Sequence, residues 1–254
     1  MQTNVGISVE IRNLKKSFNK GKIKALNGIT LNFTEGMLHG IIGPAGAGKT
    51  TLLRIILTLM EKDEGNIQYY SDGQAINFKT IMPNAAYMPE QQSLYADLSI
   101  EEHLKFFASM YGLDHNTYIE RTQNLLTMTK LEKFLNRPAG KLSGGMYKKL
   151  GLMCALLRSP KIMFLDEPTN GVDPISRREF WDILNNATKN NITILMTTAY
   201  MDEAERCEQV HLLEDGYVLG SGEPRELLSS ESVENFDEFF IKRAAYQVRH
   251  KVYE

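Results

Sequence analysis

The chain of 254 residues has an ordinary globular composition, with 43% apolar and 24% charged residues, so it can bury a substantial core. Its length suits one large domain or one domain with a helical insertion. The formal net charge of -2 and the pI near 6.3 exclude a strong overall positive field. No nucleic-acid partner is expected.

Cysteine usage and the apolar runs bear on the compartment. Cys154 and Cys207 lie far apart, and neither has a second Cys or a His at metal-ligand spacing, which favours a reduced, cytosolic setting. The N-terminus, MQTNVGISVEIRNLKK, has no long apolar run after a basic start and does not resemble a secretory signal. The most apolar helix candidate, residues 51 to 60, contains Arg54 and is far shorter than the roughly 20 residues of a membrane span. Any membrane role is expected to run through a partner.

Strand patterns come first along the chain. Apolar and polar residues alternate in ISVEIRNL and ALNGITLNF, between Ile7 and Gly36, and predict two antiparallel strands. The run MLHGIIG, which ends at Gly43, leads into a glycine-rich loop and then into the apolar stretch from Thr51 to Met60. This order predicts a strand, a loop and a helix.

A helical portion and two buried strands follow. Ser99 and Glu102 have the spacing of a capping box at the start of a helix, and the pattern stays helical to about Pro160. The short apolar runs KIMFLDEP and NITILMTT are typical of buried parallel strands. We therefore predict a helical insertion between two strand-rich portions.

Three further signals mark element boundaries. Asp173 before Pro174 predicts the N-cap and first position of the helix that carries Trp181, and Asp215-Gly216 predicts a tight hairpin. The segment VENFDEFFIK predicts a packed terminal helix. The expected organisation is one domain over 1–254, with a core and β-subdomain at about 1–92 and 160–230, a helical subdomain at about 93–159 and a C-terminal helix or tail at about 231–254.

The segment GPAGAGKTT carries the strongest functional signal. It matches the phosphate-loop pattern and lies between a predicted strand and a predicted helix, as that motif requires. Its glycines let backbone N–H groups curl around an anion at a helix N-terminus, and its lysine and threonine suit terminal phosphates and Mg²⁺. The expected nucleotide-binding residues here are Gly43, Pro44, Ala45, Gly46, Ala47, Gly48, Lys49, Thr50 and Thr51.

An acidic pair complements this loop. The strand IMFLDE delivers Asp166 and Glu167 at its end, where open α/β sheets bind ligands. We expect Thr50 and Asp166 to hold Mg²⁺, and Glu167 to act as the general base or to orient the attacking water. Lys49 and Glu167 are the expected catalytic residues.

LSGG at residues 142 to 145 precedes the acidic strand and provides a second anion site, because Ser143 can cap a helix whose first amides and glycines face a phosphate. With this motif, nearly the whole chain resembles the ATP-binding cassette (ABC) ATPases. The segments LSGGM, LDEPTNGVDP and TTAYMDEAERC are most similar to ATPases of drug or polysaccharide exporters.

The resemblance implies an α/β fold with a RecA-like phosphate-loop core, an antiparallel β-subdomain and a helical signature subdomain. It also implies that ATP and Mg²⁺ are the cofactors and that Ser143, Gly144 and Gly145 serve the ATP of an opposing subunit. By the same resemblance, Phe18 stacks on adenine, although an aromatic there also suits a core. NGVDP, residues 170 to 174, resembles the loop that crosses the dimer interface.

Partners follow from the same resemblance. One cassette in the chain suggests a dimer with itself or with a related subunit. Membrane-spanning transporter subunits are the other expected partners, contacted through the helical portion and the loop from Glu90 to Leu98, at the inner face of the membrane. Phe106 and Phe107 suit that contact, and core packing suits them as well.

Three positions depart from the family pattern. Glu90 stands in YMPEQQ where the family has glutamine, so it can bind Mg²⁺-linked water but also carries a charge that repels phosphate. Ala199 replaces a histidine that donates a hydrogen bond near the terminal phosphate, and loss of one such donor costs roughly 100- to 1000-fold in rate. Met146 replaces a common glutamine and is expected to alter packing more than phosphate contact.

Three functions are compatible with these residues. The first is an ATP-hydrolysing exporter subunit in which two cassettes close on ATP and drive the membrane subunits. The second is a degenerate partner that binds ATP durably and lends Ser143 to another subunit's site, as Ala199 and Glu90 suggest. The third is an ABC ATPase that acts on ribosomes or DNA, which usually carries tandem cassettes or long coiled-coil insertions that are not visible here.

Overall fold

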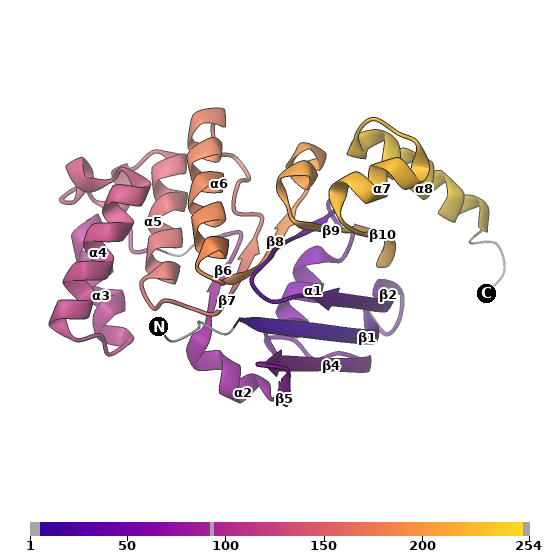
Figure 1. The fold of residues 1–254 in the computed structure, drawn as a ribbon, viewed down its shortest axis with the longest axis horizontal. Coiled ribbons are helices and arrows are strands. Elements are labelled where there is room, and N and C mark those ends of the chain that lie inside the picture. The colour runs from indigo at the N-terminus through magenta and orange to yellow at the C-terminus, as the bar shows by residue number, and fades with distance from the viewer. Residues whose placement is uncertain (1–5, 92–93, 251–254) are drawn as a thin grey trace.

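The computed structural model describes residues 6–91 and 94–250 (Figure 1). The predicted coupling loop from Glu90 to Leu98 therefore falls partly outside the described residues, as do the two ends of the predicted domain. The division of the chain into subdomains stays a prediction.

The smaller of two sheets is antiparallel and has the strand order β2-β1-β4-β5. It is built from β1 Ile7–Phe18, β2 Ile23–Phe33, β4 Glu64–Ser71 and β5 Gln74–Ile76. In β1, the apolar residues that alternate with polar ones face the core, and Val9 and Ile11 are fully buried. The predicted antiparallel pairing of the first two strands is confirmed, with Val9 opposite Phe33.

The larger sheet has the order β10-β9-β3-β8-β7-β6, and its neighbours are parallel except for the β9–β10 hairpin. Its strands are β3 Leu38–Ile42, β6 Ala85–Met88, β7 Ile162–Asp166, β8 Thr193–Thr198, β9 Gln209–Glu214 and β10 Tyr217–Gly222. Every residue of β3, β7 and β8 is buried, which is why these segments lack polar alternation. The predicted parallel strands and hairpin are thus confirmed.

Helix α1, Lys49–Ile56, follows β3 through the glycine loop. The apolar run predicted a helix to Met60, and this boundary was wrong. The helix ends at Ile56 because Thr58 adopts a left-handed backbone conformation with φ of 56°, and the chain turns toward β4. Leu59 is then 63% exposed, although it belongs to the same apolar run.

The helical portion contains α3 Ile100–Met110, α4 His115–Thr129 and α5 Gly144–Leu156, at the end of the molecule away from the antiparallel sheet (Figure 1). Ser99 and Glu102 form the predicted capping box, and Asp173 caps α6, Pro174–Lys189, as expected. The remaining helices are α2 Phe78–Ile81, α7 Pro224–Glu231 and α8 Phe236–His250, with short 3-10 turns at Met82–Asn84, Glu132–Phe134, Ala139–Lys141 and Met201–Arg206. In the described part of the chain, no helix has the length and apolar character to cross a bilayer.

Two hydrophobic clusters of the described residues fill the interior. One contains Ile41, Leu52 and Phe164 and joins α1 to both sheets, and the other contains Met163 and Trp181 and joins the larger sheet to the helical portion. Because α1 and β7 are anchored in these clusters, the residues at their ends are held in fixed positions. This rigidity matters for the site described below.

A buried pair of histidines makes the stability of the fold depend on pH. His39 Nδ1 lies 3.1 Å from His211 Nε2, and His211 Nδ1 lies 2.8 Å from the Ser221 hydroxyl. Burial lowers the pKa of His39 to about 4 and that of His211 to about 3, with the neighbouring His39 as a second cause for His211. Since an unfolded histidine has a pKa near 6.5, the unfolded chain binds more protons between about pH 6.5 and 4.

The free energy of unfolding is therefore expected to fall as the pH drops from 7.5 to 5.5, by about 1.4 kcal/mol for each of these histidines. Urea unfolding at the two pH values measures this. His211→Gln should remove roughly half of the change, whereas His115→Gln, at an exposed position, should leave it intact. An equal pH response in the His211→Gln variant would contradict the assignment.

Candidate functional site

A cleft of about 400 Å³ lies over the phosphate loop. It is open at the carboxyl ends of β3, β7 and β8, the edge at which parallel α/β sheets bind ligands. Its lining residues come from five separate segments and are Ala25, Ala45, Gly46, Ala47, Gly48, Lys49, Thr50, Thr51, Glu90, Glu167, Asn170, Ala199 and Tyr200.

The loop backbone is shaped by glycine. Gly48 has φ of 103°, and a Cβ there would lie 2.4 Å from the Ala25 carbonyl oxygen, so a side chain is excluded by both conformation and space. Gly48 is also the N-cap residue of α1 and offers no side chain to the first amides of the helix. This helix end therefore presents backbone N–H groups and the positive end of the helix dipole to the cleft.

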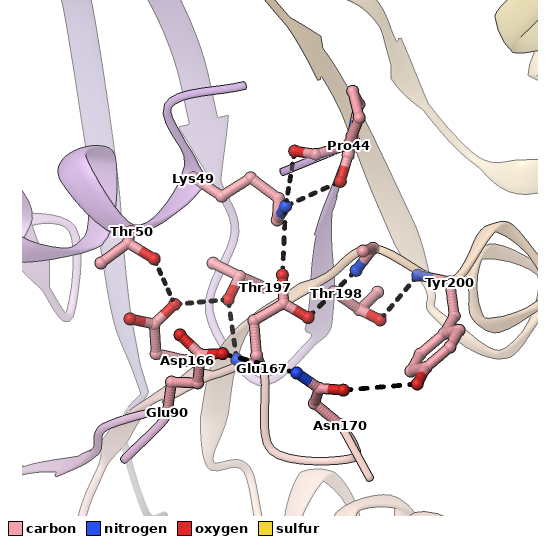
Figure 2. A network of polar contacts seen from close by, with 12 residues as sticks. Pro44, Lys49, Thr50, Glu90, Asp166, Glu167, Asn170, Thr197, Thr198 and Tyr200 are labelled. Atoms are coloured by element: carbon pink, nitrogen blue, oxygen red, sulfur yellow. Dashed lines mark hydrogen bonds and ion pairs between the residues drawn. The ribbon is translucent and has the colours of Figure 1, made fainter. Parts of the chain in front are cut away.

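Lys49 is 5% exposed and points across the loop (Figure 2). Its ammonium donates to the carbonyl oxygens of Gly43 at 2.7 Å and Pro44 at 3.0 Å, and lies 3.1 Å from Glu167 Oε1. The two residues that the sequence singles out as catalytic are thus in direct contact.

Asp166 accepts hydrogen bonds from two hydroxyl groups. Thr50 Oγ1 donates to Asp166 Oδ1 at 2.9 Å, and Thr197 Oγ1 donates to the same oxygen at 2.7 Å. Thr50 lines the cleft, and its hydroxyl therefore lies beside a carboxylate oxygen of the buried Asp166. Such oxygen donors suit Mg²⁺, which usually takes few protein ligands besides phosphate and water. Thr197 was missed in the sequence, although its position at the end of a strand parallel to β7 is the signal that finds it.

Glu167 is held in an unusual conformation. Its φ is 46°, a left-handed value that a non-glycine residue rarely adopts and that costs on the order of 1–3 kcal/mol. Its N–H donates to Thr197 Oγ1 at 2.9 Å, and the Ala199 N–H donates to Glu167 Oε2 at 3.1 Å. The carboxylate is thus fixed at the cleft by Lys49 on one oxygen and by a backbone amide on the other.

A chain of weaker contacts crosses the cleft wall (Figure 2). The Tyr200 hydroxyl donates to Asn170 Oδ1, and Asn170 Nδ2 donates to Glu90 Oε1, both at 3.4 Å. Glu90 therefore lies at the cleft, and its contact with the nucleotide stays a prediction. Asn170 and Tyr200 had no assigned side-chain role, and both belong to motif segments that were noted for other residues.

The LSGG segment, residues 142 to 145 and called the signature residues below, lies in a different place. Ser143 caps α5 by accepting from the Met146 N–H at 3.3 Å, as predicted. A Cβ at Gly145 would lie 2.3 Å from Ser176 Oγ, so this glycine lets the first turns of α5 and α6 pack together. Among the described residues, those of 143–145 do not line the phosphate cleft of their own chain, and Gly144 lines a separate hollow of about 310 Å³.

Phe18 ends β1, opposite Ile23, and is half-buried. It is not among the described residues that line the cleft, and the Lys16 ammonium lies 5.7 Å from its ring centroid. Its contact with adenine stays a prediction.

Comparison with known proteins bears on this arrangement. Residues 26–170 match the family model described as ABC transporter. The chain is also 34% identical to "Nod factor export ATP-binding protein I" of Burkholderia lata (strain ATCC 17760 / DSM 23089 / LMG 22485 / NCIMB 9086 / R18194 / 383), over 88% of this chain and 73% of that protein.

The chain belongs to the ABC transporter family. It is an ATP-binding cassette, and the predicted fold class is confirmed by a solved "ATP binding subunit of ABC transporter", with a TM-score of 0.80 and 29% identity over 93% of this chain and 99% of that one. The cassette is also 37% identical to "Probable multidrug ABC transporter ATP-binding protein YbhF" of Escherichia coli (strain K12), over 90% of its length. It spans 39% of the length of that relative.

Proposed function

We propose that this cassette hydrolyses ATP for an exporter, at the inner face of a membrane. ATP binds between the phosphate loop of one cassette and the LSGG segment of a second, identical or related cassette. One observation carries the proposal. Lys49, Thr50 and Glu167 line one cleft at the ends of parallel strands, and the buried Asp166 accepts a hydrogen bond from Thr50 beside it.

The roles of the cleft residues follow from their chemistry. The loop amides and the Lys49 ammonium bind the terminal phosphates, and Thr50 and Asp166 hold Mg²⁺. Bound Mg²⁺ neutralises part of the charge on the β- and γ-phosphates. Thr197 and Thr50 orient the Asp166 carboxylate through hydrogen bonds to its Oδ1 atom.

Glu167 is the group that orients and deprotonates the attacking water. Phosphate gives Lys49 a second anionic partner, while the Ala199 N–H still holds Glu167 Oε2. Glu167 then keeps its position with one oxygen turned to the cleft. Such positioning of the nucleophile, rather than covalent chemistry, is what phosphoryl transfer requires.

Export and membrane subunits are proposed from the relatives and from one surface. Two relatives carry export or multidrug transport in their names. A mainly apolar hollow of about 310 Å³ lies between β6, α3 and α5, and Met88, Leu94 and Phe107 line it. Phe106 is 42% exposed and lies at the surface, whereas its neighbour Phe107 packs against the core. We place the membrane subunit on this surface.

Crosslinking tests that placement. The native Cys154 and Cys207 are buried, so one introduced cysteine becomes the reactive thiol. Phe106→Cys should give an adduct with a membrane-embedded polypeptide when the cassette is purified from membranes of its own cells. Lys189→Cys, at an exposed site on α6, serves as the control. Adducts with ribosomal or DNA-bound proteins instead, or equal adducts from both sites, would overturn the export proposal.

A second candidate function, a durable ATP-binding partner, is favoured by Ala199. Its side chain lacks the donor that the family histidine supplies, although its backbone N–H holds Glu167. We expect slow but measurable turnover by the unmodified cassette, and Ala199→His should accelerate single-turnover hydrolysis by roughly 100-fold. If only the Ala199→His variant hydrolyses ATP, the durable-binding function replaces the proposed one.

A further inference from the structure

Glu90 is held by two residues to which the proposed mechanism gives no role. The Lys148 ammonium donates to the Glu90 backbone carbonyl at 2.9 Å, and Asn170 Nδ2 donates to Glu90 Oε1 at 3.4 Å. The Tyr200 hydroxyl occupies Asn170 Oδ1, which turns the amide nitrogen toward Glu90 (Figure 2). Glu90, Lys148 and Asn170 are called the Glu90 bridge below.

The Glu90 bridge lies on the wall between two hollows. Asn170 lines both the phosphate cleft and the hollow beside the signature residues. Glu90 lines the phosphate cleft, whereas Lys148 and Gly144 line the hollow on the other side. Lys148 belongs to α5, the helix that Ser143 caps. The bridge thus connects the phosphate cleft to the helix that begins with the signature segment.

Electrostatics give Lys148 a role beyond that tether. Burial lowers the pKa of Lys148, and the carboxylates of Glu90, Glu167 and Asp166 oppose that shift. Lys148 is half-buried, and the charges that act on it are those of the cleft. A carboxylate at position 90 repels incoming phosphates, as a glutamine would not, so a nearby positive charge has a defined effect there.

We propose that Lys148 is a positioning residue for nucleotide binding: it fixes Glu90 at the cleft wall and supplies the positive charge that offsets the Glu90 carboxylate when phosphates bind. The inference rests on the proposed function, because it concerns the same ATP cleft. It predicts that Lys148 matters mainly while residue 90 is charged.

A charge-swap series tests this, with Mg-ATP dissociation constants measured by titration of a fluorescent ATP analogue. Lys148→Met and Lys148→Gln should each weaken affinity by about tenfold, a free-energy change of about 1.4 kcal/mol. The glutamine variant keeps an N–H group that can donate to the Glu90 carbonyl. The affinity lost in this variant therefore measures the effect of the charge. Lys148→Arg should bind like the parent, and so should Lys133→Met, a control at an exposed lysine.

The decisive comparison uses a second background. With Glu90→Gln present, Lys148→Met should change affinity by less than about twofold, because the carboxylate that needs compensation is gone. An equal loss in both backgrounds would show a purely structural tether and overturn the proposal, as would unchanged affinity of Lys148→Met and Lys148→Gln. The same titration of the parent chain and of Lys49→Ala separates the two proposals. If the parent binds Mg-ATP and Lys49→Ala binds it weakly, a failed charge-swap series overturns this inference alone. A parent chain that binds no Mg-ATP overturns the proposed function too.

Discussion

Lys49→Ala is expected to weaken ATP affinity by roughly 100-fold, because it removes the buried cation of the phosphate loop and its charge-assisted hydrogen bonds to phosphate. Lys49 is 5% exposed, and its ammonium is fixed by the Gly43 and Pro44 carbonyl oxygens in a residue that lines the cleft. A preorganised cation contributes more to affinity than a mobile one, since little conformational entropy is lost on binding. Equilibrium titration with labelled ATP measures the change.

The control for this variant is Lys62→Ala, at an exposed lysine outside the cleft, which should bind ATP normally. Lys49→Ala also deprives Glu167 of its ion-pair partner, so thermal unfolding must show that the variant is folded. A folded Lys49→Ala variant with parental affinity would rule out the phosphate-loop assignment.

Glu167→Gln should leave ATP affinity close to the parental value and slow hydrolysis by roughly 100- to 1000-fold. The amide keeps the size of the side chain but accepts a proton from water poorly, and general-base catalysis contributes rate factors of about this size. The change leaves the backbone atoms in place, so the left-handed conformation at position 167 and its N–H bond to Thr197 should persist. Rate and affinity are therefore expected to separate.

Quenched-flow hydrolysis with protein in excess over ATP measures that separation. Glu132→Gln, at an exposed carboxylate in a 3-10 turn away from the cleft, is the matched control and should hydrolyse at the parental rate. Parental turnover by Glu167→Gln would mean that another group activates the water.

Local patterns predicted the parts of the fold that are encoded locally. The buried strands, the capping box at Ser99 and the Asp173 cap each depend on residues within a few positions of one another, and the structure has them where the pattern placed them. The end of α1 was wrong because apolar periodicity continues through Leu59, while the turn at Thr58 is set by how the chain reaches β4.

The site also contains residues that a local motif encodes and contacts that no local motif encodes. The phosphate loop and the acidic pair are contiguous motifs, so their residues could be named from the sequence. The contacts of Thr197 with Asp166 and of Asn170 with Glu90 join segments that are distant in the chain, and no local pattern encodes them. Lys148 was missed for the same reason, since its contact with the Glu90 carbonyl depends on how α5 packs beside the cleft.

Ala199 shows how a departure from a motif can be read only in part. From the sequence, the substitution removes a side-chain donor. In the structure, the backbone N–H at the same position holds Glu167 Oε2, a contact that any residue except proline can make. The cassette therefore keeps the Glu167 carboxylate fixed while it lacks the family's imidazole.

The most direct test is single-turnover hydrolysis of radiolabelled ATP by the unmodified chain, with protein in excess and with bound ATP and ADP separated and quantified. Bound ATP should convert to ADP when Mg²⁺ is supplied and should persist when it is chelated. ATP that remains intact on the protein in the presence of Mg²⁺, or a chain that retains no ATP, would contradict the proposal that this cassette hydrolyses ATP.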